Sequence, residues 1–194
     1  MEKKVDKDGN ASYAHDLREL VVDGANSRLY VTGHSGEGNV LFVVDTQSLN
    51  LLNTMPALGN AKAPGLAWDA ANKRAHTSNL RGEVVVVGTD TSKVEQRYKV
   101  TAEQPMNIAL DPNGPRLFIT DQGSEMISKY QGSSIEGLAS KHPGKRVLAL
   151  DRTTGQKLAS IPAGAGTLGI CWTHRASDCS DQPRGGIGDG LRQR

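Results

Sequence analysis

One phrase occurs three times in this chain and restricts the fold more than any other feature of the sequence. It consists of an apolar run that ends in Asp, a short turn, and Arg followed by an alternating run that ends in Thr or Ser. The three copies are residues 20–32, 66–78 and 108–120. Their aspartates are 46 and 42 residues apart, as are their arginines, so the internal spacing is kept. Units of about forty residues that hold several short strands are typical of propeller blades.

Each copy is followed by two more runs with the character of strands. Runs rich in β-branched residues occupy 40–46, 84–89 and 146–152, and weaker ones occupy 51–55, 94–100 and 157–161. These runs are too short for buried helices and are bounded by Gly, Asn and Asp. The sequence therefore predicts an all-β protein of about three four-stranded antiparallel β-propeller blades in an open arc.

The repeated aspartates have a structural explanation. Asp23, Asp69 and Asp111 lie where the first strand of each blade turns into the second, and Asp45 and Asp151 lie between third and fourth strands. Asp side chains accept hydrogen bonds from the backbone two or three residues further on and so favour tight turns. We therefore expect these residues to hold turns rather than to bind metal or catalyse a reaction.

The phrases resemble those of the YVTN-type β-propeller repeat family, which includes the YncE-like propellers. The resemblance rests on Arg-Leu-Tyr-Val-Thr at 28–32, Val-Val-Asp-Thr at 43–46, Pro-Met-Asn-Ile-Ala-Leu at 105–110 and Arg-Leu-Phe-Ile-Thr-Asp at 116–121. It covers about 17–170 and implies part of a seven-bladed ring that, in the family, is exported to the periplasm or cell envelope. It implies no catalytic mechanism, because propellers serve as enzymes, scaffolds and ligand binders alike.

The chain divides into three parts on this interpretation. An N-terminal segment (1–16) precedes the partial propeller (17–170), whose repeats span about 17–62, 63–104 and 105–164, with the start of a fourth to 170. The remainder, 171–194, loses all alternation where another blade phrase is due, and its composition cannot bury enough surface to order itself. We expect this tail to be disordered or to follow a frameshift, and the chain to be a truncated piece of a longer propeller.

Charge and end sequences bound the partners and the location. With 23 basic and 21 acidic residues the net charge is only +2, so nucleic acid is a conceivable partner that the charge does not indicate. No stretch is apolar enough to span a bilayer. The first residues contain no signal peptide, so the chain as written would be cytoplasmic, although the resemblance implies the periplasm or envelope. The tail cysteines Cys171 and Cys179 have the wrong spacing for a zinc site with His174.

Candidate binding residues are expected on one rim of the disc, where the loop leading into each first strand meets the loop between the second and third strands. We call this the inner-strand rim, and the rim of the Asp23, Asp69 and Asp111 turns the turn rim. The positions on the inner-strand rim vary in chemistry within otherwise matched phrases, and loops carry function disproportionately. The candidates are Arg18, Glu19, His34, Asn79, Arg81, Asn107 and Asp121.

Two further features bear on this prediction. About twenty extra residues interrupt the third repeat at 123–144, and insertions in repeats map to loops on one face, often the binding face. His76, in contrast, occupies the aromatic slot held by Tyr30 and Phe118, so we expect a packed ring with one satisfied nitrogen.

The leading hypothesis is a non-enzymatic binding or interaction module of the bacterial cell envelope. Its partner would be an unknown protein or small molecule, and uncovered blade faces would also allow self-association. No catalytic residue, metal site or cofactor is predicted, because no phosphate-binding loop, nucleophile elbow, carboxylate pair or metal-ligand cluster occurs. The alternative is a propeller enzyme of the lactonase or dehydrogenase-subunit type, with its site in the central channel.

Overall fold

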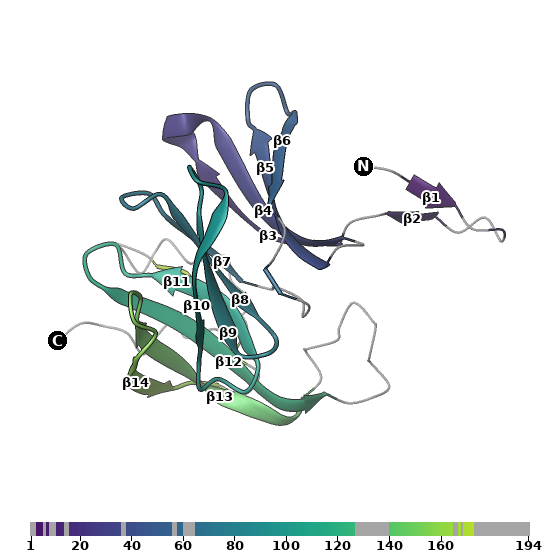
Figure 1. Cartoon of the computed structure of the whole chain (residues 1–194). Coiled ribbons are helices and arrows are strands. Elements are labelled where there is room, and N and C mark those ends of the chain that lie inside the picture. The colour runs from purple at the N-terminus through teal and green to yellow at the C-terminus, as the bar shows by residue number, and fades with distance from the viewer. Residues whose placement is uncertain are drawn as a thin grey trace.

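Three four-stranded antiparallel sheets form the body of the protein, as a computed structural model shows (Figure 1). Blade 1 contains β3 (Asp16–Asp23), β4 (Arg28–Ser35), β5 (Gly38–Asp45) and β6 (Leu51–Met55). Blade 2 contains β7 (Leu66–Asp69), β8 (Arg74–Asn79), β9 (Glu83–Gly88) and β10 (Lys93–Lys99). Blade 3 contains β11 (Pro105–Leu110), β12 (Arg116–Met126), β13 (Ser140–Asp151) and β14 (Lys157–Pro162). The strands of each blade neighbour one another in chain order, which confirms the predicted blades.

The structure describes residues 3–5, 7, 11–13, 16–35, 38–55, 58–59, 65–126, 140–164, 167 and 169–172. Within the predicted N-terminal segment, β1 (Lys3–Val5) and β2 (Ala11–Tyr13) form an antiparallel pair that the sequence did not indicate. Over these ranges the one helical element is a 3-10 turn, Gly24–Asn26, so none of the described helical structure is long and apolar enough to cross a membrane.

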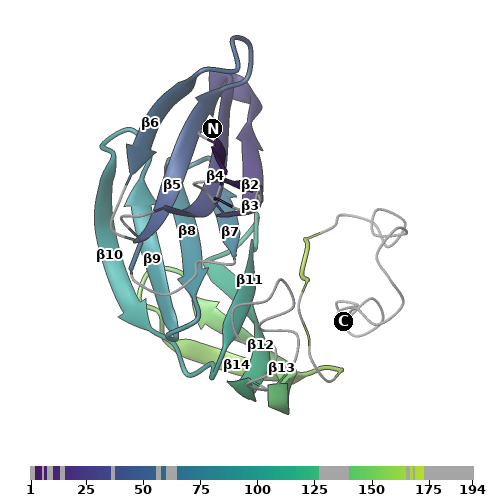
Figure 2. The same cartoon turned by 90° about the vertical axis from the view of Figure 1, so that its right-hand side faces the viewer.

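The first strands β3, β7 and β11 lie next to one another in successive blades, near the axis of the arc. Figure 2 shows the strands of blades 1 and 2 running outward from them, with β6 and β10 at the outer edge. One face of each blade packs on the next blade, because each twisted sheet must bury its apolar side chains. The first interface buries Tyr30, Leu41, Val43 and Met55 of blade 1 with Leu66, Ala75, Val85 and Val87 of blade 2. The second buries Ala67, Val84 and Val86 of blade 2 with Ile108, Leu117, Ile119, Leu148 and Leu150 of blade 3.

The aspartate turns form as predicted. Asp23 accepts hydrogen bonds from the backbone N–H of Asn26 at 3.3 Å and from its side-chain amide at 2.8 Å. Asp69 makes the same pair of bonds with Asn72, at 3.2 and 2.8 Å. Because both carboxylate oxygens are used within the turn, the repeated aspartates need no ligand to explain them.

A second repeated bond explains why each phrase ends in Thr or Ser. The hydroxyl oxygens of Thr32 and Thr120 accept the backbone N–H of Glu19 at 3.1 Å and of Asn107 at 3.0 Å, in blades 1 and 3. In blade 2 the Ser78 hydroxyl accepts the N–H of Gly65 at 3.2 Å. In blades 1 and 3 this bond lies where the pairing of the first two strands shifts register, so the buried hydroxyl satisfies a donor that the ladder leaves unpaired.

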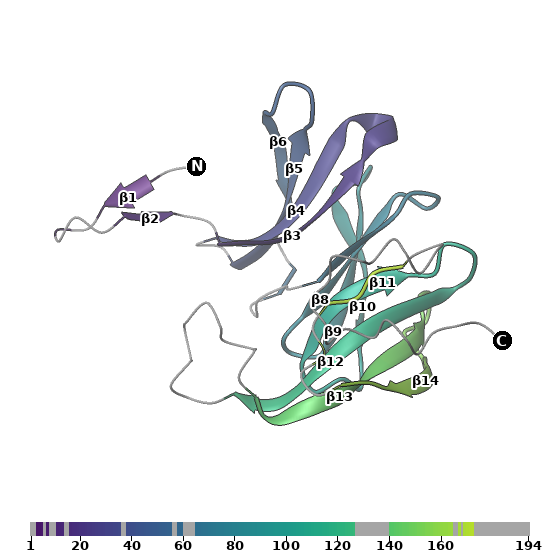
Figure 3. The same cartoon turned by 180° about the vertical axis from the view of Figure 1, so that it is seen from behind.

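The insertion in the third repeat and the segment after that repeat both depart from the sequence expectation. β12 and β13 continue into the predicted insertion as a long paired hairpin, whereas residues 127–139 lie outside the described residues. Beyond β14, Ile170 and Trp172 pack against the outer face of blade 3. Figure 3 shows the segment that contains them, residues 169–172, in yellow. The described packing thus continues two residues past the predicted boundary at 170, and the tail from 173 onward lies outside the described residues.

Candidate functional site

The inner-strand rim brings together two of the predicted residues from different blades. The side chain of Glu19, at the shift in β3, is hydrogen-bonded to that of Asn107, at the equivalent position of β11. Burial raises the pKa of the Glu19 carboxyl, and the Asn107 hydrogen bond partly offsets this. A half-buried carboxyl and an amide from blades 1 and 3 therefore meet where the first strands converge.

Gly65 occupies the same repeat position in blade 2 and explains this convergence. A Cβ atom there would lie 2.6 Å from the Ser78 hydroxyl oxygen and 3.0 Å from Asn107 Cα, closer than side chains pack. Only glycine therefore allows β7 to approach β11 so closely at this level. Because blade 2 contributes no side chain here, Glu19 reaches Asn107 across it.

Two other predicted residues use their polar groups within the fold. Asn79 is buried, donates to the Glu83 carboxylate at 2.9 Å and accepts the backbone N–H of Arg81 at 3.0 Å. Asp121 is buried, and its carboxylate forms an ion pair with Arg146 at 2.7 Å. The same carboxylate accepts the backbone N–H groups of Glu103, Gln104 and Gly123, at 3.1 to 3.2 Å. Asn79 therefore holds the β8–β9 turn, and Asp121 fixes the base of the long β12–β13 hairpin.

The remaining candidates are exposed on the same rim. Arg18 lies on β3, His34 lies near the end of β4, and Arg81 lies in the β8–β9 turn. His34 pairs in register with Asp16 and with Asn39. In the part of the chain that the structure describes, no three His, Cys, Asp or Glu side chains gather in a way that could hold a metal ion.

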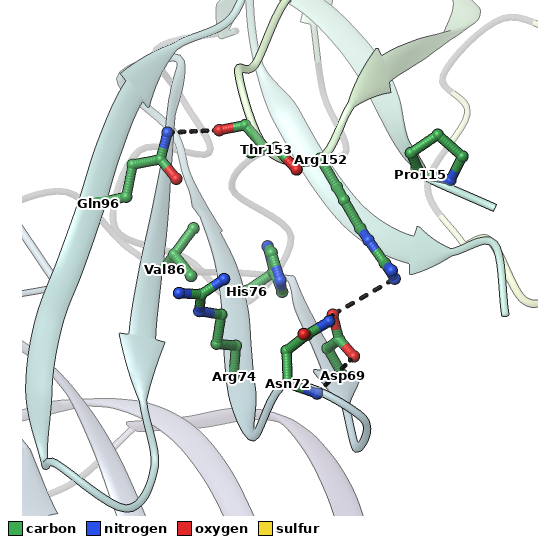
Figure 4. Close-up of a pocket in the computed structure, with 9 residues that line it drawn as sticks. All are labelled: Asp69, Asn72, Arg74, His76, Val86, Gln96, Pro115, Arg152 and Thr153. Atoms are coloured by element: carbon green, nitrogen blue, oxygen red, sulfur yellow. Dashed lines mark hydrogen bonds and ion pairs between the residues drawn. The ribbon is translucent and has the colours of Figure 1, made fainter.

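The turn rim contains a feature that the sequence did not predict. A cavity of about 270 Å³ opens between blades 2 and 3 (Figure 4). Its walls come from the β7–β8 turn, from β8, β9 and β10, and from the β11–β12 and β13–β14 turns. The lining residues are Asp69, Asn72, Arg74, His76, Val86, Gln96, Pro115, Arg152 and Thr153.

Contacts across this cavity join the two blades at its edges. Arg152 of blade 3 forms an ion pair with Asp69 of blade 2 at 3.3 Å. Gln96 of β10 donates to the backbone carbonyl of Thr153 at 2.6 Å. Figure 4 shows Arg152 and Gln96 reaching toward the opposite blade on either side of the His76 ring.

His76 corrects one sequence-based expectation. Its side chain is packed, with 2% of its surface exposed, as its aromatic slot predicted. The prediction that one ring nitrogen has a hydrogen-bond partner is wrong, because neither Nδ1 nor Nε2 has one among the described residues. Burial lowers the His76 pKa from 6.5 to about 4, so the ring is neutral at pH 7 and offers one donor and one acceptor.

Sequence reasoning overlooked this cavity because it treated the turn rim as purely structural. The signal was present in the repeat positions, since the slot of Tyr30 and Phe118 contains the smaller His76. The slot of Trp68 contains Leu110 in the next blade. Considering these two slots together, rather than His76 alone, would have indicated a loosely filled second interface.

Comparison with curated proteins gives one consistent relative. The chain is 34% identical over 152 residues to YncE of Salmonella typhi, which covers 76% of this chain and 37% of that protein. It is 35% identical over 108 residues to YncE of Escherichia coli K12, covering 54% and 30% of the two chains. The chain is homologous to YncE. No family model matches it, and it spans about a third of the length of these relatives.

Solved structures with little sequence identity show the same fold. The chain superposes on Saccharomyces cerevisiae Sqt1 with a TM-score of 0.55 at 13% identity, over 79% of this chain and 36% of that one. It superposes on a chain of the nidogen/laminin complex with a TM-score of 0.55 at 15% identity, over 76% and 47%. Together with the three sheets, these likenesses show that this YncE homologue has a β-propeller fold.

Proposed function

We propose that this YncE homologue is a non-enzymatic binding module of the bacterial cell envelope whose partner docks on the inner-strand rim. The observation that carries the proposal is the convergence of Glu19 and Asn107 from two different blades. Polar side chains gathered from several blades at one rim give a surface that a single blade cannot offer.

Two other features support this surface. The β12–β13 hairpin is longer than the hairpins of the other blades, and Asp121 with Arg146 anchors its base. Arg18, next to Glu19 in β3, and Arg81, in the β8–β9 turn, add exposed positive charge to the rim. Rigidly held polar groups surrounded by exposed charged groups are suited to a polar partner.

The envelope location rests on the resemblance to the YVTN-type repeat family, whose members are commonly exported, and it agrees with Cys171 being disulfide-bonded. Disulfides persist in oxidising compartments such as the bacterial periplasm. Separating periplasmic from cytoplasmic fractions of the native host, and detecting the full-length gene product with an antibody, tests this part of the proposal. Recovery in the cytoplasmic fraction alone contradicts it.

The rim assignment is tested by measuring which molecules of a fractionated envelope extract are retained by the full-length gene product and by two variants of it. Replacing Arg18 and Asn107 with Ala should weaken the retention of molecules that the wild-type protein retains, because removing a buried hydrogen bond to a partner costs about 1 to 3 kcal/mol of binding free energy. Lys73→Ala on the turn rim is the control and should retain them. If the control variant fails to retain these molecules while the double variant keeps them, the partner binds the other rim.

A further inference from the structure

The cavity of the turn rim lies at the one interface between described blades where the repeat changes its filling residues. In the first interface the Tyr30 ring packs on Trp68, with ring centroids 5.0 Å apart. On the outer face of blade 3, Phe118 packs in the same way on Trp172, at 6.0 Å. The second interface has His76 and Leu110 in these slots, so both partners are smaller.

A third repeat position changes together with these two. Thr89 follows the third strand of blade 2, and its hydroxyl is hydrogen-bonded to the Tyr30 side chain across the first interface. The equivalent residue of blade 3 is Arg152, which lines the cavity beside His76. The second interface thus combines additional space, a cation and a buried ring without a hydrogen-bond partner among the described residues.

The charges and donors around this space favour an anion. The lining contains two arginines and one carboxylate, and that carboxylate, Asp69, already accepts two hydrogen bonds from Asn72. The ion pair of Arg152 with Asp69, at 3.3 Å, occupies one of the five N–H donors of the guanidinium. Arg74 uses its Nε to bind Glu95, which is not part of the lining, at 2.7 Å.

A hydrophobic ligand does not fit this chemistry, because Val86 and Pro115 are the only apolar side chains of the lining. An unpaired neutral imidazole buried beside guanidinium groups is costly unless something hydrogen-bonds to it. A carboxylate or phosphate oxygen can accept from the imidazole N–H and from Arg152 at once, and planar guanidinium groups bind such oxyanions in pairs of bonds.

We propose that the cavity between blades 2 and 3 binds a small carboxylate- or phosphate-bearing anion, held by Arg152 and His76. This site is separate from the inner-strand rim and lies at the opposite end of the blades. The anion would fill the space that Tyr30 and Trp68 fill in the first interface, and would link blade 2 to blade 3 through charged groups in place of ring packing.

Isothermal titration calorimetry with succinate and with inorganic phosphate tests the proposal, at low salt and pH 7, on the full chain. We expect saturable binding of at least one of the two probes below about 10 mM, and the preferred probe distinguishes a carboxylate from a phosphate ligand. The His76 ring resonances should shift with the same saturation curve. Absence of binding by both probes, or binding without a His76 shift, would overturn the proposal.

Variants taken from the repeat itself provide the specificity test. Arg152→Thr copies the first interface at Thr89 and should weaken binding about tenfold or more. Lys73→Ser copies Ser27 of blade 1, which has the same positive φ of 52°; it removes one charge from the same rim outside the cavity and should change binding by less than about twofold. Equal losses in both variants would mean general charge attraction and would overturn the site.

A third variant keeps the test valid if Arg152→Thr disturbs the fold. His76→Tyr combined with Leu110→Trp fills the cavity as the first interface is filled, with every arginine retained, and should abolish binding without loss of thermal stability. Anion binding that survives in this filled variant would place the anion elsewhere.

Discussion

The first and second blade interfaces use the same backbone and the same repeat positions, yet they are filled differently. Tyr30 and Trp68 close the first interface with a pair of rings, and the Tyr30 hydroxyl is bonded to Thr89. In the second interface His76 takes the position of Tyr30 and Arg152 takes the position of Thr89, and a cavity of about 270 Å³ remains.

The comparison shows that a repeat can change its chemistry without changing its fold. The sheet pairings and aspartate turns that build each blade are satisfied within that blade, so the side chains that face the next blade vary more freely. A blade interface can therefore contribute ring packing and stability at one place and a polar cavity at the next.

The largest expected effect is a difference between the two interfaces in the stability lost when their equivalent ring residues are replaced by Ala. Tyr30→Ala should lower the free energy of unfolding by about 3 to 5 kcal/mol, because it opens a void in a filled interface. His76→Ala at the equivalent position should cost less than about 1 kcal/mol, because it enlarges an existing cavity and removes unpaired ring nitrogens. Urea denaturation followed by Trp fluorescence measures both; equal losses would show that the second interface is as tightly filled as the first.

The pH dependence of stability should come from the second interface. Unfolded His76, with its usual pKa of 6.5, takes up a proton that folded His76, with a pKa of about 4, does not. The free energy of unfolding should therefore fall as the pH drops from 6.5 toward 4, by up to about 3 kcal/mol at 1.4 kcal/mol per pH unit.

Denaturation midpoints at several pH values measure this loss. His76→Phe, which places the residue of the Phe118 slot in the second interface, is the matched control and should remove that part of the slope. An unchanged slope in the variant would mean that other groups, and not His76, titrate over this range.

Converting the second interface into a copy of the first should stabilise the protein. His76→Tyr with Leu110→Trp supplies the missing rings, and cavity filling of this kind contributes about 1 to 2 kcal/mol. Thermal denaturation of the double variant and both single variants measures the gain. Destabilisation of the double variant alone would indicate that the two blades are spaced by their turns and cannot accept the rings.

The smallest expected effect concerns the face of blade 1 that points away from blade 2. Leu20 is 59% exposed and Val22 is 58% exposed, whereas Ile108, which is equivalent to Leu20, is 5% exposed in the second interface. Leu20→Ser should therefore change stability by no more than about 0.5 kcal/mol. It should reduce self-association of this chain, measured by light scattering, because apolar surface left uncovered favours association. Association that is unaffected would assign it to another surface.

Much of the fold could be predicted from the repeat because its determinants are local. The spacing of Asp23, Asp69 and Asp111 indicated the blades, and their turns form as predicted because each carboxylate bonds to residues two or three positions away. The long β12–β13 pairing was not predicted, since its apolar alternation is weak and Asp121 and Arg146, which anchor it, are far apart in the chain.

The candidate sites show the opposite balance. Sequence alone placed Arg18, Glu19 and Asn107 at rim positions of the repeat, because strand period and loop order determine the rim on which a residue lies. Tertiary structure decided that Glu19 reaches Asn107 across Gly65 and that Asp121 is used within the fold. It also decided that His76 borders a cavity with Arg152, because the filling of an interface depends on how two separately formed sheets meet, and no local pattern in either sheet encodes that contact.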